Sequence, residues 1–327
     1  MWNGEKKMKK IIPISVIIPT YNRTKVLFET VRSLNSGRCV PKEIIVVDQT
    51  VPPIEFPVQI REELGKRLIV INAEIPSLTK ARNIGLRKAN CDTVLFCDDD
   101  ILINEETLAI LYETIKQEKV ALVAGIHKEE NVLYEGKKRH LLKAIGGTVF
   151  GMQKFWRQGG YVVHGSMRGR YANEIENIVP TEWAMGYFFC IKKTICEKYN
   201  IYFDEKLKRY AYAEDLDFTL RYCQKAKMNQ LKTYVDPHIY VNHLASKEWR
   251  TPSYEATLFA VANRWYLSYK IFPKCYWYRW FLNWSDWCYE HFISKDLVEK
   301  QNWHKVRQLC KQKKRYLKNG QIEKIYS

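Results

Sequence analysis

Three aspartates follow directly on a run of apolar residues in the stretch Thr93-Val94-Leu95-Phe96-Cys97-Asp98-Asp99-Asp100. The short run, with its β-branched and aromatic side chains, predicts a strand buried on both faces. Adjacent carboxylates repel one another, so a folded chain keeps them at a cost unless a cation lies nearby. Mg²⁺ and Mn²⁺ prefer carboxylate oxygens together with substrate phosphates, which favours a metal site. The structural alternative is an acidic turn that caps the helix near Glu105.

Runs of the same kind alternate with helical patterns through the first half of the chain. Strands are predicted at Ile14–Pro19, Glu43–Asp48, Arg67–Ile71 and Val120–Ala124, and helices at Thr24–Leu34, Ser77–Ala89 and Glu105–Lys116. The alternation predicts an α/β fold with a doubly wound, mainly parallel, Rossmann-like sheet. Ligands bind at the carboxyl ends of the strands in such sheets. Those ends carry Thr20-Tyr21-Asn22, Asp48 and the three aspartates.

The second half is predicted to contain a strand at Thr181–Ile191 followed by a helix at Lys193–Lys198, and it contributes further acids and two histidines. A helix is predicted at Ala213–Lys225 with Glu214 and Asp215 in its first turn. The helix dipole favours acids at this position, and it also keeps a carboxylate ionised, as a general base must be. A strand at Leu231–Val235 precedes His238 and His243, and either imidazole suits Mn²⁺. The residues alone do not decide between these two histidines.

Charge and composition restrict the class of protein. The 327 residues carry 53 Lys and Arg against 36 Asp and Glu, a formal charge of +17, which favours an anionic partner. No nucleic-acid module is recognisable, so nucleic acid is not expected as that partner. The nine cysteines form no C-x-x-C pair, which is typical of reduced thiols in a cytoplasmic protein. No apolar run approaches the roughly 20 residues of a spanning helix.

The C-terminal segment from residue 251 to 327 has a distinct pattern. Aromatic residues recur at helical spacing and form one face, which consists of Trp277, Trp280, Phe281, Trp284, Trp287 and His291. A basic tail follows, and Arg250–Ser327 holds 15 basic and 6 acidic residues, a net charge of +9. Such a helix suits an anionic membrane surface, or it packs its aromatic face onto the preceding domain.

Five motifs in this order resemble the family 2 glycosyltransferases. They are Ser15-Val16-Ile17-Ile18-Pro19-Thr20-Tyr21-Asn22-Arg23, Glu43–Asp48, Ala81-Arg82-Asn83-Ile84-Gly85-Leu86, Phe96–Asp100, and Phe203-Asp204-Glu205 followed by Ala213-Glu214-Asp215-Leu216-Asp217 and Arg221. The likeness runs from about Ile12 to about Arg250. It implies a GT-A domain at 1–250, with a nucleotide-sugar half at 12–125 and an acceptor half at 126–250. A helical, basic extension would follow at 251–327.

The resemblance also implies a role for each matching residue. Asp100 and His243 would bind Mn²⁺ or Mg²⁺, and Asp215 would be the catalytic base with Glu214 beside it. The nucleotide sugar would meet Pro19, Thr20, Tyr21, Arg23, Asp48, Arg82, Asn83, Asp98, Asp99, Lys247 and Arg250. Of these, Asp48 would accept from the imide N–H of the base, and Lys247 and Arg250 would neutralise the leaving diphosphate. Trp183 and Gly186 are expected on the acceptor side, where an aromatic ring can stack on a sugar.

The implied activity is inverting transfer of a sugar from a UDP- or dTDP-sugar to a hydroxyl of a glycan or a lipid-linked saccharide in surface polysaccharide synthesis. The expected location is the cytoplasm, with attachment to the inner face of the cell membrane if the basic segment binds lipid. Two alternatives stay open, a sugar nucleotidyltransferase and a non-catalytic nucleotide- or glycan-binding protein. Against the first, Pro19–Arg23 lacks the glycine that a phosphate loop would need. Against the second, all the acids of the motifs are present.

Overall fold

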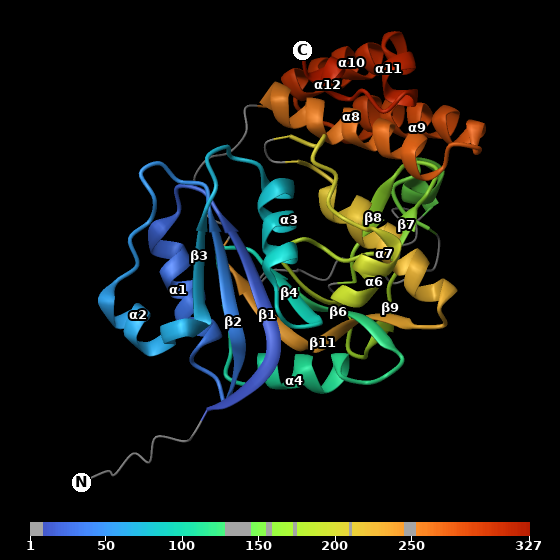
Figure 1. Ribbon diagram of the computed structural model, residues 1–327. Helices are drawn as coiled ribbons and strands as arrows, with labels where there is room; N and C mark the ends of the chain where they lie inside the picture. Colours follow the sequence, from blue (N-terminus) through green and yellow to red (C-terminus); the bar gives the residue numbers. More distant parts are fainter. Residues whose placement is uncertain (1–8, 128–144, 155–158, 173–174, 209–210, 245–252) are drawn as a thin grey trace.

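The computed structural model describes residues 9–127, 145–154, 159–172, 175–208, 211–244 and 253–327 (Figure 1). Within these residues the main sheet has nine strands in the order β3-β2-β1-β4-β10-β6-β11-β5, with β9 paired to β11. Helices lie on both faces of the sheet, and further helices at the C-terminus form a separate layer beside it. The α/β, doubly wound architecture predicted from the alternating pattern is therefore confirmed.

The strands of this sheet are β1 (Lys10–Thr20), β2 (Cys39–Asp48), β3 (Leu68–Asn72), β4 (Thr93–Cys97), β5 (Ile101–Ile103), β6 (Val120–His127), β9 (Val179–Pro180), β10 (Phe188–Lys192) and β11 (Lys232–His243). A separate hairpin consists of β7 (Tyr161–Val163) and β8 (Arg168–Arg170). The helices packed on the sheet are α1 (Thr24–Leu34), α2 (Val58–Leu64), α3 (Leu78–Lys88), α4 (Thr107–Ile115), α6 (Lys193–Tyr199) and α7 (Glu214–Met228).

Two predicted strands differ from those in the structure. The predicted strand at Thr181–Ile191 begins only at Phe188, and β10 runs antiparallel to both β4 and β6. The predicted strand at Leu231–Val235 continues as β11 to His243, so both histidines lie within the strand rather than after it. Asp236-Pro237 ends the apolar pattern after Val235, and a register shift between Val235 and Tyr240 interrupts the pairing with β6 there.

Close packing explains the glycine in the Ala81–Leu86 motif. Gly85 faces β1 from α3, and a Cβ at this position would lie 2.3 Å from Cγ2 of Ile17. Helix α3 therefore lies closer to the sheet than it could with any residue larger than glycine at position 85. Its N-terminus is capped as expected, because Ser77 Oγ accepts from the N–H of Lys80 at 3.4 Å. This approach brings the side chains at the start of α3 to the carboxyl ends of the central strands.

The C-terminal region is helical, as predicted. It comprises α8 (Ser253–Ile271), α9 (Tyr276–Cys288), a π-helical turn at Tyr289–Ile293, α10 (Leu297–Gln312), α11 (Lys314–Lys318) and α12 (Glu323–Tyr326). Its apolar side chains form one buried cluster with residues of the preceding part, among them Trp183, Leu207, Leu216 and Leu220. None of the helices in the described residues has the length and hydropathy needed to span a bilayer.

Candidate donor and metal site

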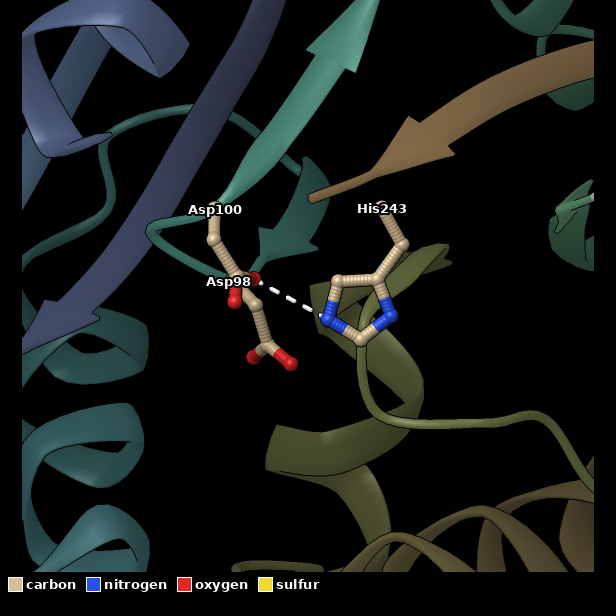
Figure 2. Close-up of side chains that lie close together, drawn as sticks. All are labelled: Asp98, Asp100 and His243. Carbon is tan, nitrogen blue, oxygen red and sulfur yellow. Dashed lines mark ion pairs between the residues drawn. The ribbon is translucent and has the colours of Figure 1, made fainter. Parts of the chain in front are cut away.

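Asp98, Asp100 and His243 lie together where β4 ends, β5 begins and β11 ends (Figure 2). One oxygen or nitrogen from each side chain lies within 4.8 Å of the others. Antiparallel pairing of β11 with β5 produces this arrangement, because it sets His243 opposite Ile101. Two carboxylates and an imidazole form a ligand set that suits Mn²⁺, so these residues fit the metal that the sequence predicted.

The structure also distinguishes the two histidines. His243 Nε2 lies 3.1 Å from Asp100 Oδ1, and this contact raises the pKa of the imidazole. His238 instead pairs with Asp236 at 2.8 Å, and its side chain is 63% exposed. Of the two, His243 is therefore the one that can join the aspartates in holding a cation.

Two further side chains, those of Tyr187 and His127, lie beside His243. The ring of Tyr187 stacks on the imidazole of His243 with the ring centroids 5.7 Å apart. His127, at the end of β6, accepts from the backbone N–H of His243 through Nδ1 at 3.2 Å. Both contacts fix the position of His243. His127 is the last residue of a buried strand, and a polar residue in that position is the sequence feature that indicates a site.

Asp99 is not one of the three residues of the candidate cation site. Its carboxylate accepts from Thr20 Oγ1 at 2.7 Å and from Arg23 at 3.0 Å, and burial raises its pKa to about 6. The Arg23 guanidinium also contacts Asp100 at 3.0 Å. These bonds join the end of β1 to the turn after β4. Thr20 and Arg23 thereby orient the aspartates, and a direct contact of these residues with a nucleotide stays a prediction.

The predicted base-binding positions lie at the ends of β1 and β2. Pro19 is buried near the end of β1, whereas the ring of Tyr21 is 42% exposed. The Asp48 carboxylate is buried and accepts from the backbone N–H of Thr50 at 2.9 Å and of Ile54 at 2.6 Å. Asp48 thus shapes the turn after β2. Each carboxylate oxygen has a second lone pair, and its bond to a nucleotide base stays a prediction.

Arg82 lies buried between the candidate cation site and the predicted catalytic acids. Its Nη2 donates to Asp98 Oδ1 at 2.7 Å and to the carbonyl of Gly186 at 2.9 Å, and its Nη1 donates to Glu214. Burial lowers the pKa of Arg82, but Glu214 and Asp98 raise it above its ordinary value. A Cβ on Gly186 would lie 3.0 Å from the guanidinium. Arg82 therefore connects the two groups of acids, a contact that the sequence did not reveal.

Asp215 is held by two backbone donors. Gly186 donates to Oδ2 at 3.0 Å and Leu216 donates to Oδ1 at 2.7 Å, while burial raises the pKa of the carboxyl. Ala213, which precedes the acids, has φ of 66°, a conformation that is unfavourable for a residue with a Cβ. Burial likewise raises the pKa of Glu214, to about 8, although Arg82 lowers it. Of the two acids, Asp215 is the one better suited to act as an ionised base.

The remaining predicted residues occupy different environments. Asn83 is buried, and its side chain donates to the carbonyl of Phe203 at 3.0 Å and accepts from the N–H of that residue at 2.9 Å. Trp183 is also buried and packs against β8. Their predicted contacts with nucleotide and acceptor are not tested by this arrangement. Lys247 and Arg250 lie outside the described residues.

Known proteins resemble this chain in sequence and in fold. Residues 15–177, about half of the chain, match the model of "Glycosyl transferase family 2". Poly(ribitol-phosphate) beta-N-acetylglucosaminyltransferase TarP of Staphylococcus aureus is 27% identical over 258 residues, which are 73% of this chain and 65% of TarP. The corresponding enzyme TarS of the same species is 34% identical over 103 residues, 30% of this chain and 18% of TarS. The matched part therefore spans less than two thirds of either relative.

A solved structure supports the fold. The crystal structure of GalNAc-T7 with UDP, GalNAc and Mn²⁺ superposes with a TM-score of 0.53 at 15% identity, covering 93% of this chain and 55% of that one. The shared architecture is the GT-A fold. The fold, the five ordered motifs and the family match agree, and the chain belongs to glycosyl transferase family 2.

Proposed function

We propose that this protein is a metal-dependent glycosyltransferase that moves a sugar from a UDP-sugar to a hydroxyl of a surface polysaccharide. The observation that carries the proposal is the arrangement of two acidic groups joined by one arginine. Asp98, Asp100 and His243 form a site for a divalent cation, and Arg82 bridges Asp98 to Glu214 beside Asp215. A cation site adjoining a candidate base suits transfer from a nucleoside diphosphate sugar, because the cation can stabilise the charge that develops on the diphosphate.

Each group has a distinct chemical task in the proposed reaction. When bound, the divalent cation would neutralise negative charge on the diphosphate. Asp215 would accept the proton of the acceptor hydroxyl as that oxygen attacks the anomeric carbon from the face opposite the diphosphate, which inverts the configuration. Gly186 and Leu216 hold the two oxygens of Asp215 in fixed directions. Burial raises the pKa of this carboxyl, so Asp215 is a stronger base than an exposed aspartate.

For the acceptor we propose a phosphate-bearing polymer or a lipid-linked precursor of one. The relatives TarP and TarS are named for transfer to poly(ribitol-phosphate). The formal charge of +17 supports an acceptor that carries repeated negative charges. Transfer to such a polymer should weaken with added salt, because salt screens long-range attraction between exposed charges.

The first experiment identifies the donor. Thermal unfolding is followed with UDP, dTDP, GDP and CMP, each with Mn²⁺ and with EDTA. A ligand that binds the folded state raises the midpoint by mass action. We expect UDP, with dTDP as the alternative, to raise the midpoint in Mn²⁺ and not in EDTA. If no nucleotide raises it, the proposed function is wrong and a non-catalytic binding protein is favoured.

We also propose that helix α9 rests against an anionic membrane on the cytoplasmic side. The buried face of α9 comprises Leu282, Ser285, Asp286 and Cys288. On the opposite face Trp277 and Trp280 are 64% and 69% exposed, so at least these two rings do not pack on the domain. Tryptophan side chains favour the membrane interface, and the net charge of +9 over Arg250–Ser327 suits acidic lipids.

Co-sedimentation with vesicles tests this attachment. The unmodified protein should pellet with vesicles that contain phosphatidylglycerol and less with neutral vesicles, and Trp277→Ser with Trp280→Ser should reduce the pelleted fraction. Tyr316, an exposed aromatic residue on α11, provides the control as Tyr316→Ser. Equal pelleting of the double variant and the unmodified protein would exclude this face of α9 as the membrane contact.

A further inference from the structure

One face of helix α8 holds the turn that carries the candidate base. Asn263 and Lys270 lie seven residues apart on this helix and therefore face the same way. Asn263 Nδ2 donates to the carbonyl of Tyr212 at 2.8 Å. Lys270 Nζ donates to Asp217 Oδ2 at 2.8 Å. The turn 211–217, which includes Asp215, is thus fixed to α8 on both sides of the acid.

The turn needs such support because its backbone is unfavourable. Ala211 and Ala213 have φ of 49° and 66°, so both lie in the left-handed region on either side of Tyr212. In that region the Cβ of an L-residue crowds the neighbouring carbonyl oxygen. Strained backbone persists only where surrounding contacts determine it, and it is frequent at functional sites. The bond to the Tyr212 carbonyl lies midway between the two strained residues.

The amide of Asn263 is itself held in one orientation. Its side chain is fully buried, and Tyr326 donates its hydroxyl to Asn263 Oδ1 at 2.7 Å. Because the amide oxygen accepts from Tyr326, the amide nitrogen faces the carbonyl of Tyr212. Tyr326 is the last residue of α12 and packs edge-on against Phe259 of α8. The final helix of the chain is in this way connected to the turn before Asp215.

We propose that Asn263 is a positioning residue for the general base, and that Tyr326 fixes the orientation of its amide. The proposal rests on the proposed function, since it assigns Asp215 that role. Loss of the Asn263 contact releases the Tyr212 carbonyl, and the strained turn then relaxes. Asp215 loses its alignment with the acceptor hydroxyl, while the cation site at Asp98 and His243, formed by other strands, is unchanged.

The test compares Asn263→Ala and Tyr326→Phe in the full chain with Tyr316→Phe, a tyrosine on α11 that is 42% exposed. Turnover is measured as UDP release from UDP-N-acetylglucosamine, or from whichever donor the thermal screen selects. We expect kcat to fall about 100-fold in Asn263→Ala and about fivefold in Tyr326→Phe, since small misplacements of a reacting group have effects of this size. The donor KM, the number of UDP sites titrated with Mn²⁺ and the control variant should be unchanged.

Amide hydrogen exchange provides a readout that needs no turnover. Exchange within 211–217 should accelerate in Asn263→Ala while exchange in β1 and β4 stays the same. A folded Asn263→Ala protein with unchanged kcat and unchanged exchange in this turn would overturn the inference. A fall in kcat that matches an equal loss of UDP sites would also overturn it, because the role would then be structural. Absence of turnover in the unmodified protein would instead count against the proposed function.

Discussion

Arg82 Nη2 lies 2.7 Å from Asp98 Oδ1, and the same guanidinium donates to Glu214. One buried cation thus joins a carboxylate of the candidate metal site to the acid that precedes the candidate base. Arginine suits this position because its planar group can donate to several acceptors in fixed directions. The candidate cation site and the candidate base are therefore connected through the side chain of Arg82.

Replacing this arginine should separate the two halves of the site. A lysine at position 82 keeps the charge but cannot reach Asp98, Glu214 and the Gly186 carbonyl together, so we expect Arg82→Lys to lower kcat by about 10- to 100-fold. Arg87→Lys is the matched control, because Arg87 lies on the same helix and its side chain is 56% exposed. Steady-state kinetics with the selected donor measure both. Equal kcat values for the two variants would show that the bridge has no role in turnover.

The role of His243 in the candidate cation site can be tested by comparison with His238, which lies on the same strand. His243→Ala removes a proposed metal ligand, so the rise in unfolding midpoint that UDP and Mn²⁺ produce together should decrease or disappear. His238→Ala should keep the full rise, because that side chain is 63% exposed and pairs with Asp236. Thermal unfolding with Mn²⁺ and with EDTA measures the effect. The assignment of His243 is wrong if its variant responds to Mn²⁺ as the unmodified protein does.

Asp215 and Glu214 should respond differently to amide replacement. Asp215→Asn removes the proposed base, and we expect kcat to fall by about 10²- to 10⁴-fold with UDP binding retained. Glu214 instead accepts from the buried Arg82 guanidinium, and a glutamine keeps an acceptor oxygen for that bond, so Glu214→Gln should cost much less. Single-turnover rates measure the chemical step for both. A larger loss of rate in Glu214→Gln than in Asp215→Asn would show that Glu214, rather than Asp215, is the base.

The pH dependence of stability should reveal the raised pKa of Asp215. Burial makes the folded pKa of this carboxyl higher than the unfolded value of about 3.9, so the folded state binds the proton more tightly. Its contribution to stability therefore decreases as pH rises from the unfolded value through the folded one. We expect Asp215→Asn to gain stability relative to the unmodified protein between about pH 4 and about pH 7. Denaturant unfolding in EDTA at both pH values measures this, and a difference that is constant with pH would contradict it.

Local sequence patterns predicted the parts of the site that depend on single elements. The run before Asp98 is a strand, Ser77 caps α3, and Glu214 opens α7. The positions of Asp48 and the aspartates at the carboxyl ends of β2 and β4 followed from the parallel order of these strands. In each case the deciding information lies within about ten residues.

Contacts between elements that are far apart in the chain could not be predicted from the sequence. The pairing of β11 with β5 selects His243 over His238, and no local pattern encodes it. The bridge from Arg82 to Glu214 joins residues that are 132 positions apart. Asp99 differs from its neighbours because the bonds from Thr20 and Arg23 turn its side chain to β1. Such details depend on the assembled sheet and on packing rather than on propensity.

Turnover of the selected UDP-sugar in Mn²⁺, in EDTA and after Mn²⁺ is restored is the most direct test of the account. The unmodified protein should release UDP and transfer the sugar only when Mn²⁺ is present, and Asp100→Asn should fail in every condition while remaining folded. Transfer that continues in EDTA, or an Asp100→Asn variant that turns over at the unmodified rate, would contradict the metal-dependent mechanism proposed for this site.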